Sequence, residues 1–210
     1  MHILITGGAG FIGGHLAESF ATEGHNITVL DNYEPYYDLG IKDHNVDAAR
    51  EAAADHGGSY EVVDGSVTNT DLLDDLTKTT DAIYHQAAQA GVRKSVEEPA
   101  KVNEYNVTGT VNVLEAARKN DIDRVVYASS SSVYGKPEYL PYDEEHPTEP
   151  VSPYGVSKLS SEHYMRVYNE VYGLPTVSLR YSVDHIDSRV VSSDGDESDG
   201  TSCGGSSNRW

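Results

Sequence analysis

The chain has 210 residues, which is enough to bury one sizeable hydrophobic core. It carries 34 Asp and Glu residues against 15 Lys and Arg, and the formal net charge of −19 argues against nucleic acid and anionic membranes as partners. The one cysteine, Cys203, excludes an internal disulfide framework and a cysteine-based zinc site.

Two features of the sequence favour a cytoplasmic protein. Met1 leads directly into an apolar segment without a basic region or a cleavage site, and no apolar run is long enough to span a bilayer.

The acidic residues are spread along the whole chain, as in proteins that are soluble at very high salt. A halophilic source is therefore one hypothesis, and an ordinary acidic cytosolic protein is the alternative.

Short apolar strands alternate with helical segments along most of the chain. We expect the first strand at His2–Thr6, followed by a helix at Phe11–Glu23 that closes at Gly24. The other strands are expected at Ile27–Leu30, Tyr60–Val63, Ala82–Tyr84, Arg124–Ala128 and Thr176–Leu179. The other helices are expected at Ile41–His56, Thr70–Leu76, Glu97–Asn120 and Ser152–Tyr172. This alternation predicts an α/β fold with a doubly wound parallel sheet, helices on both faces and a ligand crevice at the carboxyl ends of the strands.

The composition changes after Arg180. Residues 182–210 are rich in Ser, Gly and Asp, and Val190-Val191 is their only adjacent apolar pair. Such a segment buries too little apolar surface to offset the entropy cost of ordering it. We therefore predict one folded domain at residues 1–181 and an aberrant, disordered tail at residues 182–210.

A glycine-rich segment separates the first strand from the first helix. Gly7, Gly10 and Gly13 have the spacing G-x-x-G-x-x-G, which suits a tight turn that brings the backbone and a helix N-terminus close to a pyrophosphate. A simple glycine-rich turn is the alternative. Asp31 closes the second strand about 20 residues further on, where a carboxylate accepts hydrogen bonds from a ribose 2′-hydroxyl and repels a 2′-phosphate. This favours NAD over NADP, unless Asp31 merely caps a turn.

Tyr154 and Lys158 are four residues apart on a predicted helix and therefore share one face. An ammonium group beside a phenol favours the phenolate, so we expect the pKa of Tyr154 to fall from about 10 toward neutrality. Such a tyrosine is a usable general acid or base. The serines at 129–132 end the fifth strand, where a hydroxyl can bind the substrate oxygen that Tyr154 deprotonates; an ordinary loop is the alternative.

His85 follows the fourth strand and is succeeded by small residues that would let a cofactor pass close to the chain. One interpretation is that His85 acts as a general base or as a metal ligand. No second His or Cys lies at ligand spacing, so we predict a structural histidine with satisfied hydrogen bonds and no metal site.

Together these residues resemble the extended short-chain dehydrogenase/reductase family, and within it the NAD-dependent nucleotide-sugar epimerases and dehydratases. The resemblance covers about residues 1–181 and implies a Rossmann-type sheet. It rests on Thr6–Gly13, Asp31-Asn32, His85-Gln86-Ala87-Ala88, Asn106, Ser129–Gly135, Tyr154 with Lys158, and Leu179-Arg180-Tyr181. The stretch Ala87–Val92 with Ser95, and Asp31-Asn32 before a tyrosine-rich loop, look most like UDP-glucose and UDP-glucuronate 4-epimerases.

The resemblance implies NAD as cofactor and a nucleotide-diphosphate sugar, a UDP-hexose, as substrate. Tyr154 would take the proton of the sugar 4-hydroxyl while hydride passes from C4 to NAD and later returns to the other face. Ser130 and Lys158 would assist as catalytic residues. The residues implied to bind NAD are Gly7, Gly10, Phe11, Ile12, Gly13, Asp31, Asn32, Ser66, Val67, Gln86, Ala87, Ala88, Asn106, Lys158 and Tyr181. Ser66 takes the place of the usual adenine-side Asp, unless Asp64 does so with a shift.

Other activities remain open on this scaffold. Dehydratases carry an Asp-Glu pair where this chain has Ser131 and Ser132, which counts against a sugar-nucleotide dehydratase. No residue distinguishes a 4-epimerase from a UDP-glucuronate decarboxylase in the same way. Family members are longer, so the missing substrate domain and the change near Ser182 suggest a truncation or a change of reading frame. A non-catalytic NAD-binding remnant is therefore a further alternative. The resemblance also makes a homodimer plausible, formed through the helices expected at Glu97–Asn120 and Ser152–Tyr172.

Overall fold

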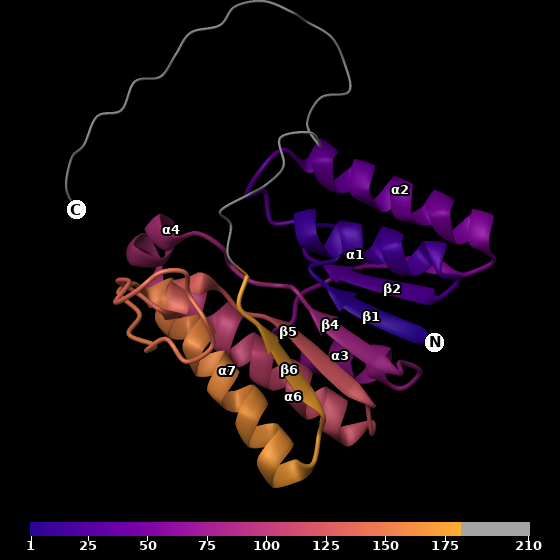
Figure 1. Cartoon of the computed structure of the whole chain (residues 1–210). Coiled ribbons are helices and arrows are strands. Elements are labelled where there is room, and N and C mark those ends of the chain that lie inside the picture. Colours follow the sequence, from indigo (N-terminus) through magenta and orange to yellow (C-terminus); the bar gives the residue numbers. More distant parts are fainter. Residues whose placement is uncertain (182–210) are drawn as a thin grey trace, which may run out of the picture.

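A computed structural model describes residues 1–181; the predicted tail at 182–210 lies outside the described residues. Six parallel strands form one sheet in the order β3-β2-β1-β4-β5-β6 (Figure 1). The strands are β1 (His2–Thr6), β2 (Asn26–Asp31), β3 (Tyr60–Asp64), β4 (Ala82–His85), β5 (Arg124–Ala128) and β6 (Thr176–Leu179). This is the strand order of a Rossmann-type doubly wound sheet, as predicted.

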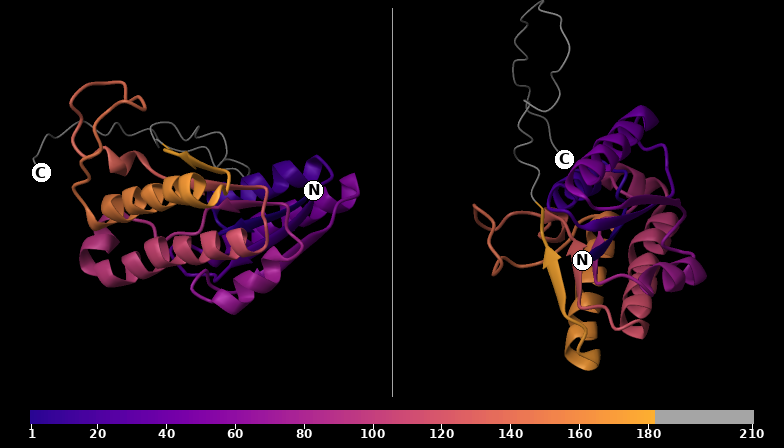
Figure 2. Two further views of the ribbon diagram at one scale, coloured as in Figure 1. Left: turned by 90° about the horizontal axis from the view of Figure 1, so that it is seen from below. Right: turned by 90° about the vertical axis from the view of Figure 1, so that its right-hand side faces the viewer.

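The sheet separates two apolar cores because successive side chains of a strand point to opposite faces. Ile3 and Ile5 of β1 pack in one core with alanines of α1 (Phe11–Thr22) and α2 (Leu39–His56). Leu4 packs in the other core, with side chains from three further helices. These are α3 (Thr70–Thr77), α6 (Gly109–Lys119) and α7 (Pro153–Tyr172). Both faces of the central strands are therefore covered, and α6 and α7 lie side by side (Figure 2).

The segment expected to form one helix at Glu97–Asn120 is more varied. A short helix, α4 (Val92–Glu97), precedes it, and α5 (Pro99–Asn103) runs through a π-helical turn at Glu104–Thr108 into α6. A π turn leaves a backbone carbonyl without its usual i+4 partner. Here the Asn106 carbonyl accepts hydrogen bonds from the Thr110 hydroxyl (2.5 Å) and from the Ser161 hydroxyl of α7 (2.9 Å). The distortion is thus stabilised by side chains, one of them from a neighbouring helix.

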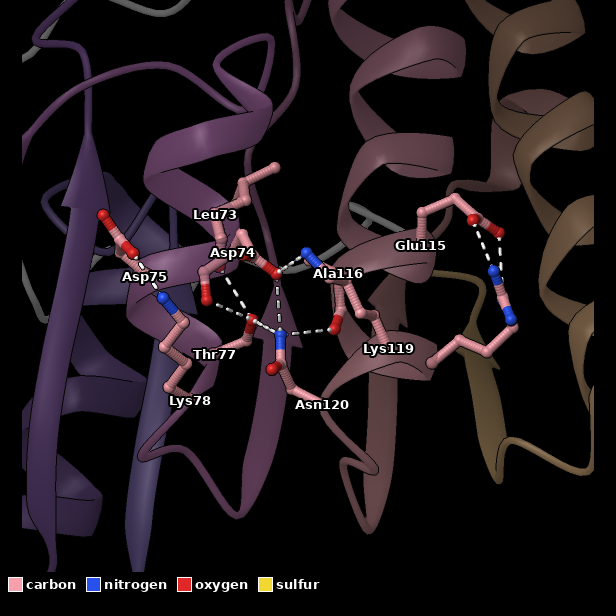
Figure 3. Close-up of polar contacts among 10 residues, drawn as sticks. Leu73, Asp74, Asp75, Thr77, Lys78, Glu115, Ala116, Lys119 and Asn120 are labelled. Carbon is pink, nitrogen blue, oxygen red and sulfur yellow. Dashed lines mark hydrogen bonds and ion pairs between the residues drawn. The ribbon is translucent and has the colours of Figure 1, made fainter.

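A polar cluster joins the ends of α3 and α6 on the outer surface (Figure 3). The Asn120 amide nitrogen donates to Asp74 Oδ1 (3.1 Å) and Thr77 Oγ1 (2.9 Å) of α3, and to the Ala116 carbonyl (3.2 Å) of its own helix. Lys119 Nζ lies 2.8 Å from Asp74 Oδ1. One amide therefore caps α6 and ties it to α3.

The chain reverses its winding direction between β1 and β4, which are neighbours in the sheet. The connection after β1 leads to α1 on one face, whereas the connections on the β4–β5 side lead to helices on the other face. Loops therefore diverge at the carboxyl ends of these two strands and leave a crevice between them. None of the helices in residues 1–181 is both long enough and apolar enough to cross a bilayer.

Candidate active site

A cavity of about 330 Å³ occupies this crevice. It brings together residues from eight separate segments of the chain, including nearly all of those singled out in the sequence. The singled-out residues that line it are Gly7, Gly10, Phe11, Ile12, Gly13, Asp31, Asn32, Ser66, Val67, Gln86, Ala87, Ala88, Ser130, Tyr154, Lys158 and Tyr181. Asp64 is exposed at the end of β3, so Ser66 is the member of that pair that reaches the cavity.

The glycine loop packs too closely for side chains. Gly7 has φ +68° and lies against the loop that follows β4. A Cβ added to Gly7 would come within 2.7 Å of the Ala87 nitrogen in that loop. A Cβ on Gly13 would collide with the Gly7 carbonyl. Helix α1 begins at Phe11 without a side-chain cap and without an acid in its first turn, so its N–H groups remain available to an anion. This cradle fits the pyrophosphate of a dinucleotide.

Asp31 is buried at the end of β2 and is held by three donors. Its Oδ2 accepts from the Ala9 N–H (3.2 Å), and its Oδ1 accepts from the Tyr33 N–H (2.9 Å) and from Lys42 Nζ (2.8 Å). The sequence analysis did not single out Lys42, which α2 brings into the cavity wall. Its only sequence signal is its place after a tyrosine-rich loop, and contact with Asp31 requires the tertiary fold.

Two side chains in the cavity wall have polar atoms without well-aligned partners. Among residues 1–181, no well-aligned hydrogen bond reaches the buried Tyr37 hydroxyl or either polar atom of the Gln86 amide, although the Phe11 backbone lies near the first and the Tyr181 hydroxyl near the second. Buried polar groups are nearly always hydrogen-bonded, so such atoms mark places where a ligand is expected. With the glycine cradle and the Asp31 carboxylate, they provide the donors and acceptors that a dinucleotide such as NAD requires.

Tyr154 and Lys158 lie in the first turns of α7, which begins at Pro153. Ser152 is the N-cap of this helix, and the Ser152 hydroxyl accepts a hydrogen bond from the Gly155 N–H (3.1 Å). Lys158 is 2 % exposed, and its Nζ donates to the Ala128 carbonyl at the end of β5 (2.8 Å). The same Nζ lies 5.8 Å from the centroid of the Tyr154 ring. The helix thus places the phenol and the ammonium group in one wall of the cavity.

The pKa of Tyr154 differs from the expectation. Burial raises the pKa of the phenol, and hydrogen bonding with Ser130 opposes this only in part. Burial also lowers the pKa of Lys158 to about 7, against the opposing influence of Glu162. In the absence of a ligand the predicted fall of the Tyr154 pKa toward neutrality is therefore wrong, because the same burial that positions the two groups disfavours both charges.

His85 is fully buried behind the cavity. Thr110 Oγ1 donates to the Asn106 carbonyl, so it accepts from His85 Nε2 (3.0 Å), which leaves Nδ1 to accept from Thr6 Oγ1 (2.7 Å). Burial lowers the pKa of the imidazole to about 3. The prediction of a structural histidine with satisfied hydrogen bonds is confirmed. Within residues 1–181, no cluster of three or more His, Cys, Asp or Glu side chains is arranged to hold a metal ion.

Asn106 is the one residue expected to bind NAD that does not line the cavity. Its Oδ1 accepts from the Gln89 N–H (2.7 Å), and its Nδ2 donates to the Gln89 carbonyl (3.3 Å) and to Ser157 Oγ (2.9 Å). The buried amide therefore ties the loop after β4, which lines the cavity, to α7, which carries Tyr154. In this arrangement Asn106 positions two walls of the site.

Comparisons with known proteins agree with this geometry. The model of the NAD dependent epimerase/dehydratase family matches residues 3–183. The chain is 42 % identical over 182 residues to a putative UDP-glucose 4-epimerase of Methanocaldococcus jannaschii, covering 86 % of this chain and 55 % of that protein. It is 37 % identical over 183 residues to UDP-glucuronate 4-epimerase 4 of Arabidopsis thaliana, covering 85 % and 40 %.

One similar solved structure is the UDP-glucuronic acid 4-epimerase of Bacillus cereus, which was crystallised with UDP-glucuronic acid and NAD. It superposes with a TM-score of 0.77 at 33 % identity, over 86 % of this chain and 56 % of that one. The chain thus spans about half the length of the relatives that it matches.

Proposed function

The chain belongs to the NAD-dependent epimerase/dehydratase family, and we propose that residues 1–181 bind NAD and carry the acid/base group of a UDP-sugar 4-epimerase. The observation that supports this most is a single cavity that unites the glycine loop, Asp31 and the Tyr154–Lys158 pair. The similarity to proteins named as UDP-sugar 4-epimerases supports the choice of reaction.

The proposed roles follow from the surroundings of each side chain. NAD, when bound, supplies the hydride acceptor for transient oxidation of the sugar. Tyr154 accepts the proton of the sugar 4-hydroxyl and later returns it, and Ser130, beside it in the cavity, hydrogen-bonds the same oxygen. Lys158 is fixed on the Ala128 carbonyl, and its positive charge favours the phenolate when its amino group is protonated. The glycine loop and the α1 N-terminus hold the pyrophosphate, and Ser66, Val67, Gln86 and Tyr181 complete the walls.

The reaction is tested by product analysis with UDP-glucose and UDP-glucuronate. An epimerase forms the C4 epimer without accumulating NADH, whereas a decarboxylase releases carbon dioxide from UDP-glucuronate. Tyr154→Phe should keep NAD affinity within about threefold of the wild type, because the hydroxyl serves the proton transfer, and should lose turnover. Full turnover by Tyr154→Phe would contradict the proposed acid/base group.

A second candidate is an NAD-binding chain without turnover. For the 210 residues of this chain it is favoured by the extent of the match, which spans 55 % of the Methanocaldococcus jannaschii protein. This candidate predicts that calorimetry detects NAD binding while neither UDP-glucose nor UDP-glucuronate is converted to product.

A homodimer is also part of this proposal. Helix α7 carries apolar side chains on its outer surface, among them Val156, Val167 and Val171, which are 51 %, 39 % and 65 % exposed. Such a row favours burial against a second copy. Sedimentation velocity tests it, since Val167→Glu should shift a dimer toward monomer.

A further inference from the structure

Lys42 is a buried cation in the cavity wall that the proposed catalysis does not use. It is 6 % exposed, and its Nζ forms a 2.8 Å ion pair with Asp31 Oδ1. The rings of Tyr33 and Tyr37 lie 5.6 and 5.9 Å from the same nitrogen. Lysines are rarely buried unless they are paired, because removing the charge from water is costly. The pairing therefore fixes an ammonium group at the place where the nucleotide ribose is expected.

The hydrogen bonds of this pair leave unused capacity toward the cavity. A carboxylate offers about four acceptor positions, and Asp31 uses three of them, for Ala9, Tyr33 and Lys42. An ammonium group has about three donors, and among residues 1–181 Lys42 spends one, on Asp31. The Tyr37 hydroxyl beside them has no well-aligned hydrogen bond within the same residues. One acceptor, two donors and a hydroxyl are thus available together.

These groups suit a ribose with free hydroxyls, since each hydroxyl both donates and accepts a hydrogen bond. The two charges of the pair cancel locally. A 2′-phosphate meets less repulsion here than it would beside an unpaired carboxylate, and it would be attracted by the ammonium group if the carboxylate were absent.

We propose that Lys42, together with Asp31, determines which nicotinamide cofactor the site accepts. The intact pair binds the unphosphorylated ribose of NAD, and Lys42 alone is a ready-made contact for the 2′-phosphate of NADP. This inference rests on the proposed function, because it requires a dinucleotide in the cavity.

The test is isothermal titration of the full chain with NAD and with NADP, in the wild type, Asp31→Asn and Asp31→Asn/Lys42→Gln. Asp31→Asn should move the ratio of the two affinities toward NADP by about 10- to 100-fold, the size expected for one charge-assisted hydrogen bond. Adding Lys42→Gln should reverse most of that shift. Lys78→Met, which removes an exposed lysine paired with Asp75 on α3, is the matched control and should leave the ratio unchanged.

Asp31→Asn leaves a buried ammonium unpaired, so thermal melting of each variant accompanies the titrations. If that variant does not fold, Lys42→Gln and Lys42→Arg provide the same comparison: Gln should move the ratio toward NAD by about tenfold, and Arg should preserve it. A ratio that none of these substitutions moves would overturn the role of Lys42 while NAD binding stands. Binding of neither cofactor to the wild type would overturn the proposed function, and this inference with it.

Discussion

The residues of the candidate site are held by buried polar contacts between segments that are far apart in the sequence. Asn106 joins Gln89 to Ser157, and His85 joins Thr6 to Thr110. Each of these groups is buried with its hydrogen bonds made, which fixes the loops around the cavity before any ligand binds. The walls that carry Tyr154 and the segment after β4 are therefore positioned by side chains that do not themselves line the cavity.

Lys158→Met is expected to remove a pH dependence of stability. Burial lowers the pKa of the Lys158 ammonium group to about 7 from its ordinary value of 10.5. Between these values the unfolded chain binds more protons at this site than the folded chain, so the free energy of unfolding rises with pH. Urea unfolding between about pH 7 and pH 9 should show a steeper rise for the wild type than for the variant.

The exposed Lys78→Met is the control, and its slope should equal that of the wild type. Identical slopes in the wild type and Lys158→Met would mean that the buried lysine titrates as it does in the unfolded chain.

At the scale of elements, the sequence predicted the six strands to within one residue at either end, because buried parallel strands are short apolar runs between polar turns. It did not predict α4, which has only six residues and begins after Gly91 at φ +97°. Nor did it predict the π turn, whose stabilising contact from Ser161 comes from another helix. Features that depend on tertiary contacts leave no local pattern.

The same limit applies to the site. The glycine loop, Asp31 and the Tyr154–Lys158 spacing are local patterns, and the structure gathers all of them in one cavity. Lys42 was missed because its meaning depends on Asp31, which lies on a different element. The raised pKa of Tyr154 was missed because the spacing describes the neighbouring charge but not the burial of both groups.

Asn120→Ala is expected to weaken the contact between α3 and α6. The substitution removes the hydrogen bonds from the Asn120 amide to Asp74, Thr77 and the last turn of α6 (Figure 3). A loss of about 1–2 kcal/mol in the free energy of unfolding is expected for a partly buried amide. Urea denaturation measures it. Lys78→Ala nearby removes only an exposed ion pair with Asp75 and should cost much less than Asn120→Ala, so equal losses would contradict the account.

At the scale of the whole molecule, apolar surface remains open on one face of the sheet. Val177 and Leu179 of β6 are 42 % and 39 % exposed, and they pair in register with Val126 and Ala128 of β5. All four side chains lie on the opposite face of the sheet from Tyr127. Within residues 1–181, neither of the two apolar cores includes them. The chain spans 55 % of the Methanocaldococcus jannaschii protein, and we propose that a segment outside residues 1–181 covers this face.

The charge of the molecule predicts a strong response to salt. The chain has a net charge of −19 on 210 residues, so its acidic side chains repel one another in the folded state. Added salt screens that repulsion. The melting temperature should therefore rise as KCl is increased from roughly 0.1 M to roughly 2 M. A flat response, or an equal rise with uncharged sucrose, would show that screening of the acidic surface is not the cause.

Titration of the chain with NAD in a calorimeter, in the wild type and in Gly10→Val, tests the central claim most directly. Gly10 has φ −72°, which any residue tolerates, and a Cβ there would lie 3.1 Å from the Gly7 carbonyl oxygen, so a valine needs a small shift of the loop and places a side chain in the cradle at the start of α1. The account predicts one NAD bound per wild-type chain and an affinity at least about tenfold weaker in the folded variant. No binding to the wild type, or equal binding to both proteins, would contradict a dinucleotide site in this cavity.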